Sequence, residues 1–320
     1  MQIVVVGAGG IGQWTAHQLG LAGSDVILAS RSGTGIGPGV SATPNSNVRT
    51  ARVDAADANV LTELATGADV LVNAVNPPYT DWDEKWPPMA AAFLQAAERS
   101  GAALLTIGNL YPYGRPTAAP MTESSPVAPN GHKGQIRARM WQEAEEAHRA
   151  GRIRAAELRA ADYFGPGVSE GMSYLNTYAI KPAIAGKTAH HIMGVVDAPH
   201  SWTYVPDIGR LAAAIAASDP AGDAWGRLWH VPTTPPKSLM DVAHDAAAIA
   251  GVPARTPRPY SRIVKTAMRV SPLIRELDEM APAFESPYVL DSSAAQARFG
   301  LAPAPWREAL EETAAWLRAS

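Results

Sequence analysis

Residues 1–12 read MQIVVVGAGGIG, and this stretch decides the fold class. Residues 3–6 form a continuous apolar run, which is typical of a strand covered by helices on both faces. A glycine-rich turn follows at once, and residues 13–19 have the composition of a helix. The order strand, tight turn, helix predicts the first unit of a nucleotide-binding α/β sheet.

The glycines of this turn fit the pattern G-x-G-x-x-G at Gly7, Gly9 and Gly12. The first glycine of the pattern allows the sharp turn, the second lets a pyrophosphate approach the backbone, and the third lets the helix pack closely on the strand. Free N–H groups at the helix start, around Gly10 and Ile11, would hold the anion. We therefore expect a bound dinucleotide; an ordinary glycine-rich turn is the alternative.

The end of the second predicted strand, at residues 25–29, favours NADP(H) over NAD(H). An NAD site places an acidic residue about 20 residues beyond the glycines, where it binds the ribose 2′-hydroxyl. This sequence has Ser30 and Arg31 there. A guanidinium group would bind the 2′-phosphate of NADP through charge-assisted hydrogen bonds, whereas a carboxylate would repel it. The alternative is that Arg31 is a solvated loop residue.

The next segments continue the alternation of strands and helices. We predict a loop at 33–47, strands at 48–53, 69–73, 103–107 and 154–160, and helices at 58–65, 89–100 and 131–150. This order predicts a Rossmann-type, doubly wound parallel sheet with right-handed crossovers. Asp54 follows the third strand, where it could lie near the adenine. Ala74 and Asn76 follow the fourth strand, where a nicotinamide ribose would pass.

The regular alternation fades in the second half of the chain. Helices are predicted at 171–185, 207–217, 238–251 and 305–318, separated by loops rich in aromatic residues and proline. We therefore expect a dinucleotide-binding domain at residues 1–165 and a smaller substrate-binding lobe at 166–320. The lobe would pack on the sheet edge, with some strands and the last helix returning to the core.

Composition excludes several classes of function. The net charge of −3 gives no indication of nucleic acid or an anionic membrane as a partner. The absence of cysteine excludes disulfides, thiolate catalysis and Cys-based metal sites, and favours a cytoplasmic location. No apolar run approaches the roughly 20 residues of a membrane span. The histidines lack metal-binding spacing, so we expect no metal site. We expect the partner to be a small-molecule substrate.

Several later motifs indicate where the chemistry lies. Residues 107–114 read IGNLYPYG, 123–129 read ESSPVAP, 133–137 read KGQIR, 162–167 read DYFGPG, 202–207 read WTYVPD and 299–303 read FGLAP. This layout resembles the extended short-chain dehydrogenase/reductases, the NAD-dependent epimerase/dehydratase family. The resemblance spans nearly the whole chain. It implies a Rossmann fold and chemistry at a nicotinamide cofactor.

The sequence departs from that family at the catalytic positions. Family members typically have a Ser that binds the substrate oxygen, a Tyr that is the general acid/base, and a Lys four residues later that holds the nicotinamide ribose. Aligning the motifs puts Asn109, Lys133 and Arg137 in these three places. Gln13 also stands where the last glycine of the extended pattern would be. The resemblance therefore points to an atypical branch without the Tyr-x-x-x-Lys dyad.

Proton transfer is still possible with these residues. Asn109 could donate a hydrogen bond to a substrate oxygen, and Arg137 could hold the ribose. Lys133, if desolvated beside the cationic Arg137, would lose its proton more readily and could act as a general acid/base. Alternatively, Lys133 is a solvated residue at a helix start, and the tyrosine chemistry has moved elsewhere.

Other tyrosines are candidates for that relocated role. Tyr111 and Tyr113 lie close to Asn109 in sequence, and Tyr79 follows the fourth strand; Tyr178 near Lys181 is a less favoured candidate. The resemblance places Tyr163 and His200 near the substrate, together with Tyr79. Trp82 and Trp86 could roof an apolar pocket for a ring-bearing substrate.

Three functions are compatible with this reading. The first is an NADP(H)-dependent oxidoreductase of the atypical short-chain type, acting on a carbonyl or alcohol. The second is an epimerase or dehydratase that recycles its cofactor internally. The third is an NADP-binding redox sensor without turnover. The resemblance also admits a homodimer, since many relatives pair through long helices.

Overall fold

Seven parallel strands form the central sheet of the structure, a computed structural model that describes residues 1–41, 47–116, 120–168 and 171–320. Positions 42–46 of the predicted 33–47 loop lie outside the described residues. The strand order is β10-β6-β5-β4-β1-β2-β3. The strands are β1 (Gln2–Val6), β2 (Asp25–Ser30), β3 (Val48–Arg52), β4 (Val70–Asn73), β5 (Ala103–Asn109), β6 (Ala155–Ala160) and β10 (Arg227–His230). The predicted doubly wound parallel sheet is confirmed.

The strand order reverses between β1 and β4, and this reversal positions the site. From β1 the chain moves outward through β2 and β3, then returns to β4 and moves outward on the other side. In such sheets a ligand binds beyond the carboxyl ends of the strands at the point of reversal. The glycine turn follows β1 directly, so it lies at this point.

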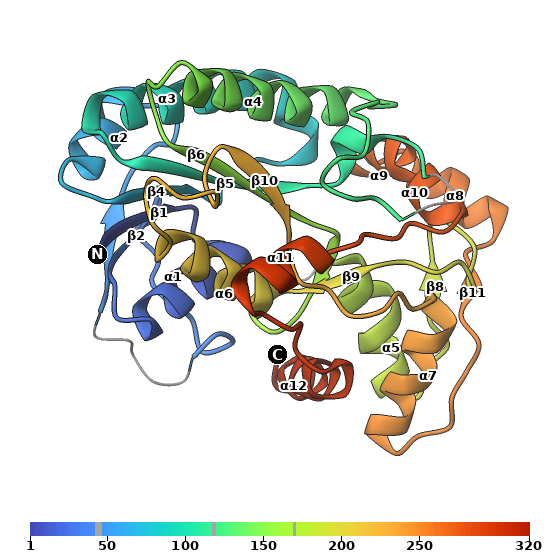
Figure 1. The fold of residues 1–320 in the computed structure, drawn as a ribbon. Helices are drawn as coiled ribbons and strands as arrows, with labels where there is room; N and C mark the ends of the chain where they lie inside the picture. Colours follow the sequence, from blue (N-terminus) through green and yellow to red (C-terminus); the bar gives the residue numbers. More distant parts are fainter. Residues whose placement is uncertain (42–46, 117–119, 169–170) are drawn as a thin grey trace.

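Helices cover both faces of the sheet (Figure 1). One face carries α1 (Gly10–Leu21), α6 (Val205–Ala216) and α11 (Ser293–Phe299), and the other carries α2 (Ala58–Ala65), α3 (Trp82–Ser100) and α4 (His132–Arg149). Residues 3–6 of β1 are buried because helices pack on both sides. The run is therefore continuously apolar because both faces of β1 are covered by helices, as the sequence indicated.

The helices predicted at 89–100 and 171–185 have different bounds in the structure. The helix expected at 89–100 begins at Trp82, although Pro87 and Pro88 lie inside it. Trp82 and Trp86 are almost fully buried, so tertiary packing outweighs the two lost backbone hydrogen bonds. The segment expected at 171–185 is helical only from 174 to 184 and contains a π-helical turn at Asn176–Ile180. Such a turn accommodates a proline, here Pro182, that cannot donate its own N–H.

The C-terminal lobe has an aromatic core of its own. It contains α5 (Lys181–Ile184), α7 (Leu239–Ala250) and two small parallel ladders, β7 (Asp162–Phe164) with β9 (Trp202–Tyr204) and β8 (His190–His191) with β11 (Arg258–Pro259). Short helices follow: α8 (Arg262–Met268), α9 (Pro272–Leu277), the 3-10 turn η4 (Asp278–Met280) and α10 (Pro282–Glu285).

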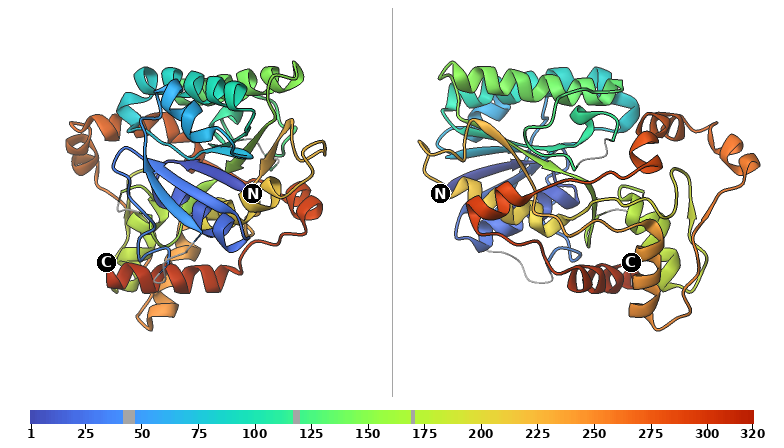
Figure 2. Two further views of the ribbon diagram at one scale, coloured as in Figure 1. Left: turned by 90° about the vertical axis from the view of Figure 1, so that its left-hand side faces the viewer. Right: turned by 45° about the vertical axis from the view of Figure 1, so that its right-hand side comes forward.

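The lobe and the sheet exchange elements. Strand β10 and helices α6 and α11 come from the second half of the chain but join the sheet layers. The last helix, α12 (Trp306–Ala319), was expected to return to the sheet core. It packs instead in the lobe beside α7, because Ala309 and Leu310 are buried with the aromatic cluster there. Figure 2 shows α12 below the sheet layers. The boundary at residue 165 stays a prediction.

Within the described parts of the chain, no helix combines the length and apolar character needed to cross a bilayer.

Candidate cofactor and active site

Three of the four glycines in the turn leave no room for a side chain, and Gly9 is the exception. A Cβ on Gly7, where φ is +113°, would lie 2.5 Å from the carbonyl oxygen of Ala74, and a Cβ on Gly12 would lie 1.7 Å from the carbonyl oxygen of Gly7. A Cβ on Gly9 would meet nothing within 4 Å. Helix α1 begins at Gly10, and no side chain caps it. The helix start is therefore open to an anion on the side of Gly9.

Neighbouring loops pack around this turn. The Gln13 side chain donates a hydrogen bond to Ala8 O at 2.9 Å and accepts one from Gly37 N at 2.7 Å. A Cβ on Gly10 would lie 2.8 Å from Gly167 O, so the 165–168 loop also lies against the helix start. Ile11 packs partly buried against the core. Gln13, which replaces the last glycine of the extended pattern, thus holds the 33–41 loop to the turn.

Two arginines flank the turn after β2. The Ser30 hydroxyl accepts backbone N–H groups from Gly33 at 3.1 Å and Thr34 at 3.3 Å, so Ser30 shapes this turn. Arg31 is exposed beside it. Arg52 is exposed at the end of β3, in register with Ser30, and its Cγ lies 3.1 Å from where a Cβ on Gly33 would be. Sequence reasoning missed Arg52; its signal was a cation ending the neighbouring strand.

The remaining predicted cofactor residues lie at the same edge of the sheet. The Asp54 carboxylate accepts the N–H of Ala56 at 3.0 Å and closes an exposed turn after β3. Ala74 donates its N–H to Val6 O at 2.9 Å and faces the glycine turn. Asn76 is exposed two residues further along. Their contacts with a cofactor stay predictions.

Two phenol groups meet beyond the carboxyl ends of β4 and β5. The hydroxyl oxygens of Tyr79 and Tyr111 lie 2.6 Å apart. The Tyr79 ring stacks on Trp82 at 5.1 Å between centroids. Burial raises the pKa of Tyr79 to about 12, and burial raises the pKa of Tyr111 well above its ordinary value. The Asn109 side chain accepts the N–H of Tyr111 at 3.2 Å and so holds the backbone of this turn.

Lys133 and Arg137 do not form the expected pair of cations. The Lys133 side chain is 2% exposed, and its ammonium contacts Glu276 and, at 3.3 Å, Glu279. Glu279 also accepts the backbone N–H of Lys133 at 2.8 Å. The premise that a neighbouring cation controls Lys133 is therefore wrong, because two carboxylates from the C-terminal lobe neutralise it. Its catalytic role stays a prediction.

Arg137 lies against indole rings. Its guanidinium carbon lies 4.2 Å from the ring centroid of Trp86 and 5.0 Å from that of Trp82, and it donates a hydrogen bond to Ile107 O at 3.3 Å. Burial lowers the pKa of Arg137. The side chain supports the aromatic wall behind Tyr79. Its expected contact with a ribose stays untested.

The predicted substrate residues His200 and Tyr163 join this region through Asp162. The His200 Nε2–H donates a hydrogen bond to the Asp162 carboxylate at 2.7 Å, and the ring stacks between Trp202 and Phe284 with centroid distances of 4.2 Å and 4.7 Å. Burial, with the nearby phenol of Tyr79 and the charge of Asp162, raises the pKa of Tyr163. Asp162 was not predicted, since nothing in the sequence paired it with a histidine 38 residues away.

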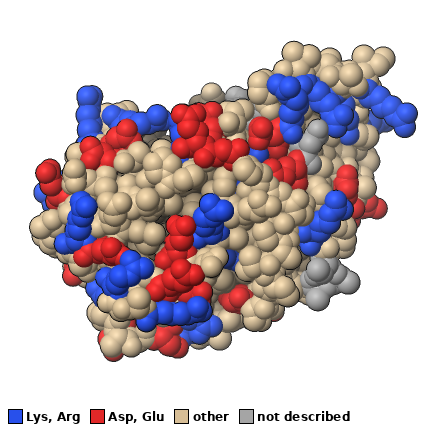
Figure 3. Space-filling model, turned by 90° about the horizontal axis from the view of Figure 1, so that it is seen from above, with Lys and Arg blue, Asp and Glu red and all other residues tan. Residues whose placement is uncertain are grey.

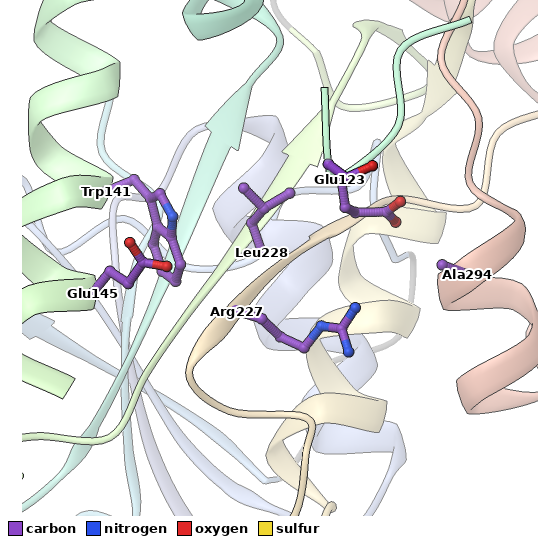
Figure 4. A pocket seen from close by; sticks show the side chains of 7 residues that line it. Glu123, Trp141, Glu145, Arg227, Leu228 and Ala294 are labelled. Atoms are coloured by element: carbon purple, nitrogen blue, oxygen red, sulfur yellow. The ribbon is translucent and has the colours of Figure 1, made fainter. Parts of the chain in front are cut away.

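Some alternatives lie apart from the phenol pair. Tyr113 forms a buried hydrogen bond with His230 at 2.8 Å, and Tyr178 packs on Tyr174. A cavity of about 370 Å³ lies at the outer edge of the sheet, beside β10 and α4 (Figure 4). Its lining includes Trp141, Glu145 and Arg227, and none of the predicted site residues contributes to it. Among the described residues, no three His, Cys, Asp or Glu side chains could hold a metal ion.

The fold and the glycine turn define a Rossmann-type nucleotide-binding protein. A sequence model of the NAD dependent epimerase/dehydratase family matches residues 3–226. The chain therefore belongs to the NAD-dependent epimerase/dehydratase family. None of the curated proteins compared matches the sequence.

Solved structures with similar folds include a dTDP-glucose 4,6-dehydratase double mutant from Streptomyces venezuelae with NAD bound. It is 20% identical, with 99% of this chain and 97% of that chain covered and a TM-score of 0.76. UDP-glucose 4-epimerase from Thermotoga maritima is 16% identical, with 100% and 99% covered and a TM-score of 0.76. UDP-glucuronic acid 4-epimerase from Bacillus cereus with NAD is 17% identical, with 100% and 99% covered and a TM-score of 0.78. At these identities the likeness concerns the fold.

Proposed function

We propose that the protein is an NADP(H)-dependent oxidoreductase of the atypical short-chain type, which interconverts a carbonyl compound and its alcohol. The observation that carries this proposal is the phenol pair of Tyr79 and Tyr111, which lies beyond the carboxyl ends of β4, the neighbour of β1, and of β5. Burial keeps the phenol of Tyr111 protonated at neutral pH, so it can donate a hydrogen bond to a carbonyl oxygen.

In this proposal the cofactor supplies the hydride when it is bound. Tyr111 donates a hydrogen bond to the carbonyl oxygen and gives up its proton as that oxygen gains negative charge. Tyr79, whose hydroxyl lies 2.6 Å away, returns a proton to Tyr111 and recovers one from solvent. Asn109 holds the backbone of Tyr111 and thereby fixes the position of the donor.

Two guanidinium groups support the preference for NADP(H). Arg31 follows β2 and Arg52 ends the adjacent strand β3, so the two side chains flank the Ser30 turn. The adenosine ribose of a dinucleotide lies at this turn in this fold. Together the two arginines offer several N–H donors to a 2′-phosphate. The dehydratase and epimerase structures named above hold NAD, so the titration below compares both cofactors.

A second candidate function is an epimerase or dehydratase that recycles its cofactor. The family membership favours it, because the solved structures named above are epimerases and a dehydratase. The two candidates differ in cofactor consumption. An oxidoreductase oxidises one NADPH for each substrate molecule, whereas an epimerase or dehydratase leaves the amount of reduced cofactor unchanged.

The experiment has two parts. Fluorescence titration compares NADPH with NADH, and we expect tighter binding of NADPH. A panel of carbonyl compounds, weighted to ring-bearing ones because Tyr79 and Trp82 form a stacked aromatic wall, is then screened for NADPH oxidation. Tighter binding of NADH would contradict the cofactor assignment. Binding of NADPH with no oxidation across the panel would favour the epimerase or the redox sensor without turnover.

A further inference from the structure

Helix α8 presents an apolar stripe to solvent. Ile263 is 83% exposed and Val270, two residues past the helix end, is 82% exposed. Ile263 and Ala267, which is also exposed, are four residues apart and lie on one side of the helix, and Val270 follows in the exposed turn at its end. We call Ile263, Ala267 and Val270 the α8 face. No other large apolar side chain among the described residues exceeds 64% exposure.

A second stripe of the same helix is cationic. Arg262, Lys265 and Arg269 have the spacing i, i+3, i+7 and lie beside the α8 face. Residues 246–275 contain no Asp or Glu, and three further cations fall in this stretch: Arg255, Arg258 and Arg275. Figure 3 shows Lys and Arg side chains gathered at the right-hand end of the molecule, where Figure 1 places α8. The net charge of −3 therefore conceals a strongly positive region.

The fold fixes which side of α8 is outward. Met268 packs against the lobe core, on the side of the helix opposite the α8 face. The Ser261 hydroxyl accepts the N–H of Val264 at 3.3 Å and caps the helix start. No residue of α8 is buried, and the helix lies at the outer end of the lobe in both views of Figure 2. The apolar residues are thus held outward by the way the helix is anchored.

We propose that α8 docks on an anionic lipid surface. A helix that lies in a membrane interface places apolar side chains at the boundary between headgroups and acyl chains, and its Lys and Arg side chains bind anionic headgroups. The α8 face and the adjacent cationic stripe fit this arrangement. A lipid surface also suits a convex outer end of a lobe, because it requires no matching concave groove.

Docking through α8 would bring the lipid surface close to the candidate active site. The α8 face ends at Val270, and only six residues further along Glu276 contacts Lys133. Arg275 lies between them. The Lys133 ammonium in turn lies 5.6 Å from the ring centroid of Tyr79, so docking through α8 would place the lipid on the part of the lobe that borders the phenol pair and would supply an apolar carbonyl compound there. This last point depends on the proposed function, whereas docking itself does not.

The test is co-sedimentation of the full-length chain with phosphatidylcholine vesicles, with and without phosphatidylglycerol. We expect binding only to vesicles that contain phosphatidylglycerol, and weaker binding as salt is raised. The variants Ile263→Asp and Val270→Asp should each lose at least tenfold in vesicle affinity, as should Arg262→Glu combined with Lys265→Glu. Leu21→Asp, which changes an apolar side chain 64% exposed on α1, is the matched control and should bind as the original chain does.

Thermal unfolding and NADPH titration of every variant report whether the fold and the cofactor site persist. Absence of binding to phosphatidylglycerol vesicles at low salt would overturn the proposal. So would an equal loss in Leu21→Asp. A dimer in solution that Ile263→Asp dissociates, with no vesicle binding, would show that a second copy or another protein covers the α8 face. Vesicle binding and thermal unfolding are measured without a cofactor, so failure of the oxidoreductase assignment leaves both readouts intact.

Discussion

The hydroxyl oxygens of Tyr79 and Tyr111 lie 2.6 Å apart although 32 residues separate them in the chain. Parallel strands β4 and β5 bring them together, because each tyrosine lies just beyond the carboxyl end of its strand. Trp82 stacks against Tyr79 and covers one face of its ring. The pair therefore forms a half-buried proton donor with a second phenol behind it.

Replacement of Tyr111 tests the donor directly. We expect Tyr111→Phe to lower kcat for carbonyl reduction by about 10²-fold or more, which is the usual contribution of a positioned general acid. Tyr79→Phe should cost less, because Tyr111 keeps its own proton. Stopped-flow measurement of NADPH oxidation gives both rates. An unchanged rate in Tyr111→Phe, with NADPH still bound, would remove the phenol from the mechanism.

The raised pKa of Tyr79 predicts a loss of stability at alkaline pH. Its pKa rises from 10.0 to about 12 on folding, so the neutral phenol stabilises the folded state fully below pH 10. That contribution is lost as pH rises from about 10 to about 12, and it amounts to at most about 3 kcal/mol. Urea unfolding at several pH values should show a smaller alkaline loss in Tyr79→Phe than in the original chain. Equal losses would mean that Tyr79 does not couple folding to pH.

Lys133→Met separates a catalytic role from a structural one. The ammonium links Glu276 and Glu279 to α4, so its removal leaves two carboxylates facing each other. We expect a loss of roughly 1–3 kcal/mol in unfolding free energy and a raised KM, with kcat reduced by less than about tenfold. Arg152→Met, which removes an exposed ion pair with Glu98, is the control and should cost under about 1 kcal/mol. A kcat loss of about 10²-fold at unchanged stability would instead make Lys133 the catalytic acid.

Arg31 and Arg52 should carry the cofactor preference. Arg31→Ala and Arg52→Ala are each expected to weaken NADPH about tenfold, since a charge-assisted hydrogen bond contributes about 1.5–3 kcal/mol. NADH affinity should change little, because it lacks the 2′-phosphate. Arg49→Ala, on the same strand as Arg52 but further from its carboxyl end, serves as the control. Equal losses for both cofactors would point to a general electrostatic effect.

Two glycines of the turn allow a matched pair of substitutions by alanine. Gly9→Ala places its methyl group in open space, so the chain should fold normally and bind NADPH at least about tenfold more weakly, because the methyl stands in the path of the pyrophosphate. Gly12→Ala puts the methyl 1.7 Å from Gly7 O and should destabilise the protein by several kcal/mol. Melting temperature and NADPH titration distinguish the two. Normal NADPH affinity in Gly9→Ala would argue against a dinucleotide at this turn.

Patterns local to the sequence predicted the sheet well. The runs at 3–6 and 103–107 are buried on both faces and the run at 25–29 is mostly buried, and such strands are recognisable without tertiary information. The start of α3 was predicted seven residues too late. Two consecutive prolines at 87 and 88 are typical of a helix boundary, whereas the burial of Trp82 and Trp86 that extends the helix depends on tertiary packing. The place of α12 depended on which core its apolar face would meet, which helix periodicity does not encode.

The site was predictable where one segment supplies it and not where distant segments meet. The glycine turn and Arg31 follow single strands, so motif spacing located them. Arg52 required knowledge of which strand adjoins β2. The Lys133 partners come from 143 and 146 residues further along the chain. Nothing in the 133–137 motif indicated those carboxylates, and this is why Lys133 was paired with the wrong charge.

The return of α6 and β10 to the sheet limits how this chain can be divided. Helix α6 supplies Ile208, Leu211 and Ile215 to the core on the α1 side of the sheet, near the glycine turn, and β10 pairs with β6 at the sheet edge. A fragment that stops at residue 165 would expose this apolar layer and leave β6 as a bare edge. A chimera with a relative would therefore have to exchange the lobe in three pieces, before α6, between β10 and α11, and after α11, because α6, β10 and α11 belong to the sheet layers.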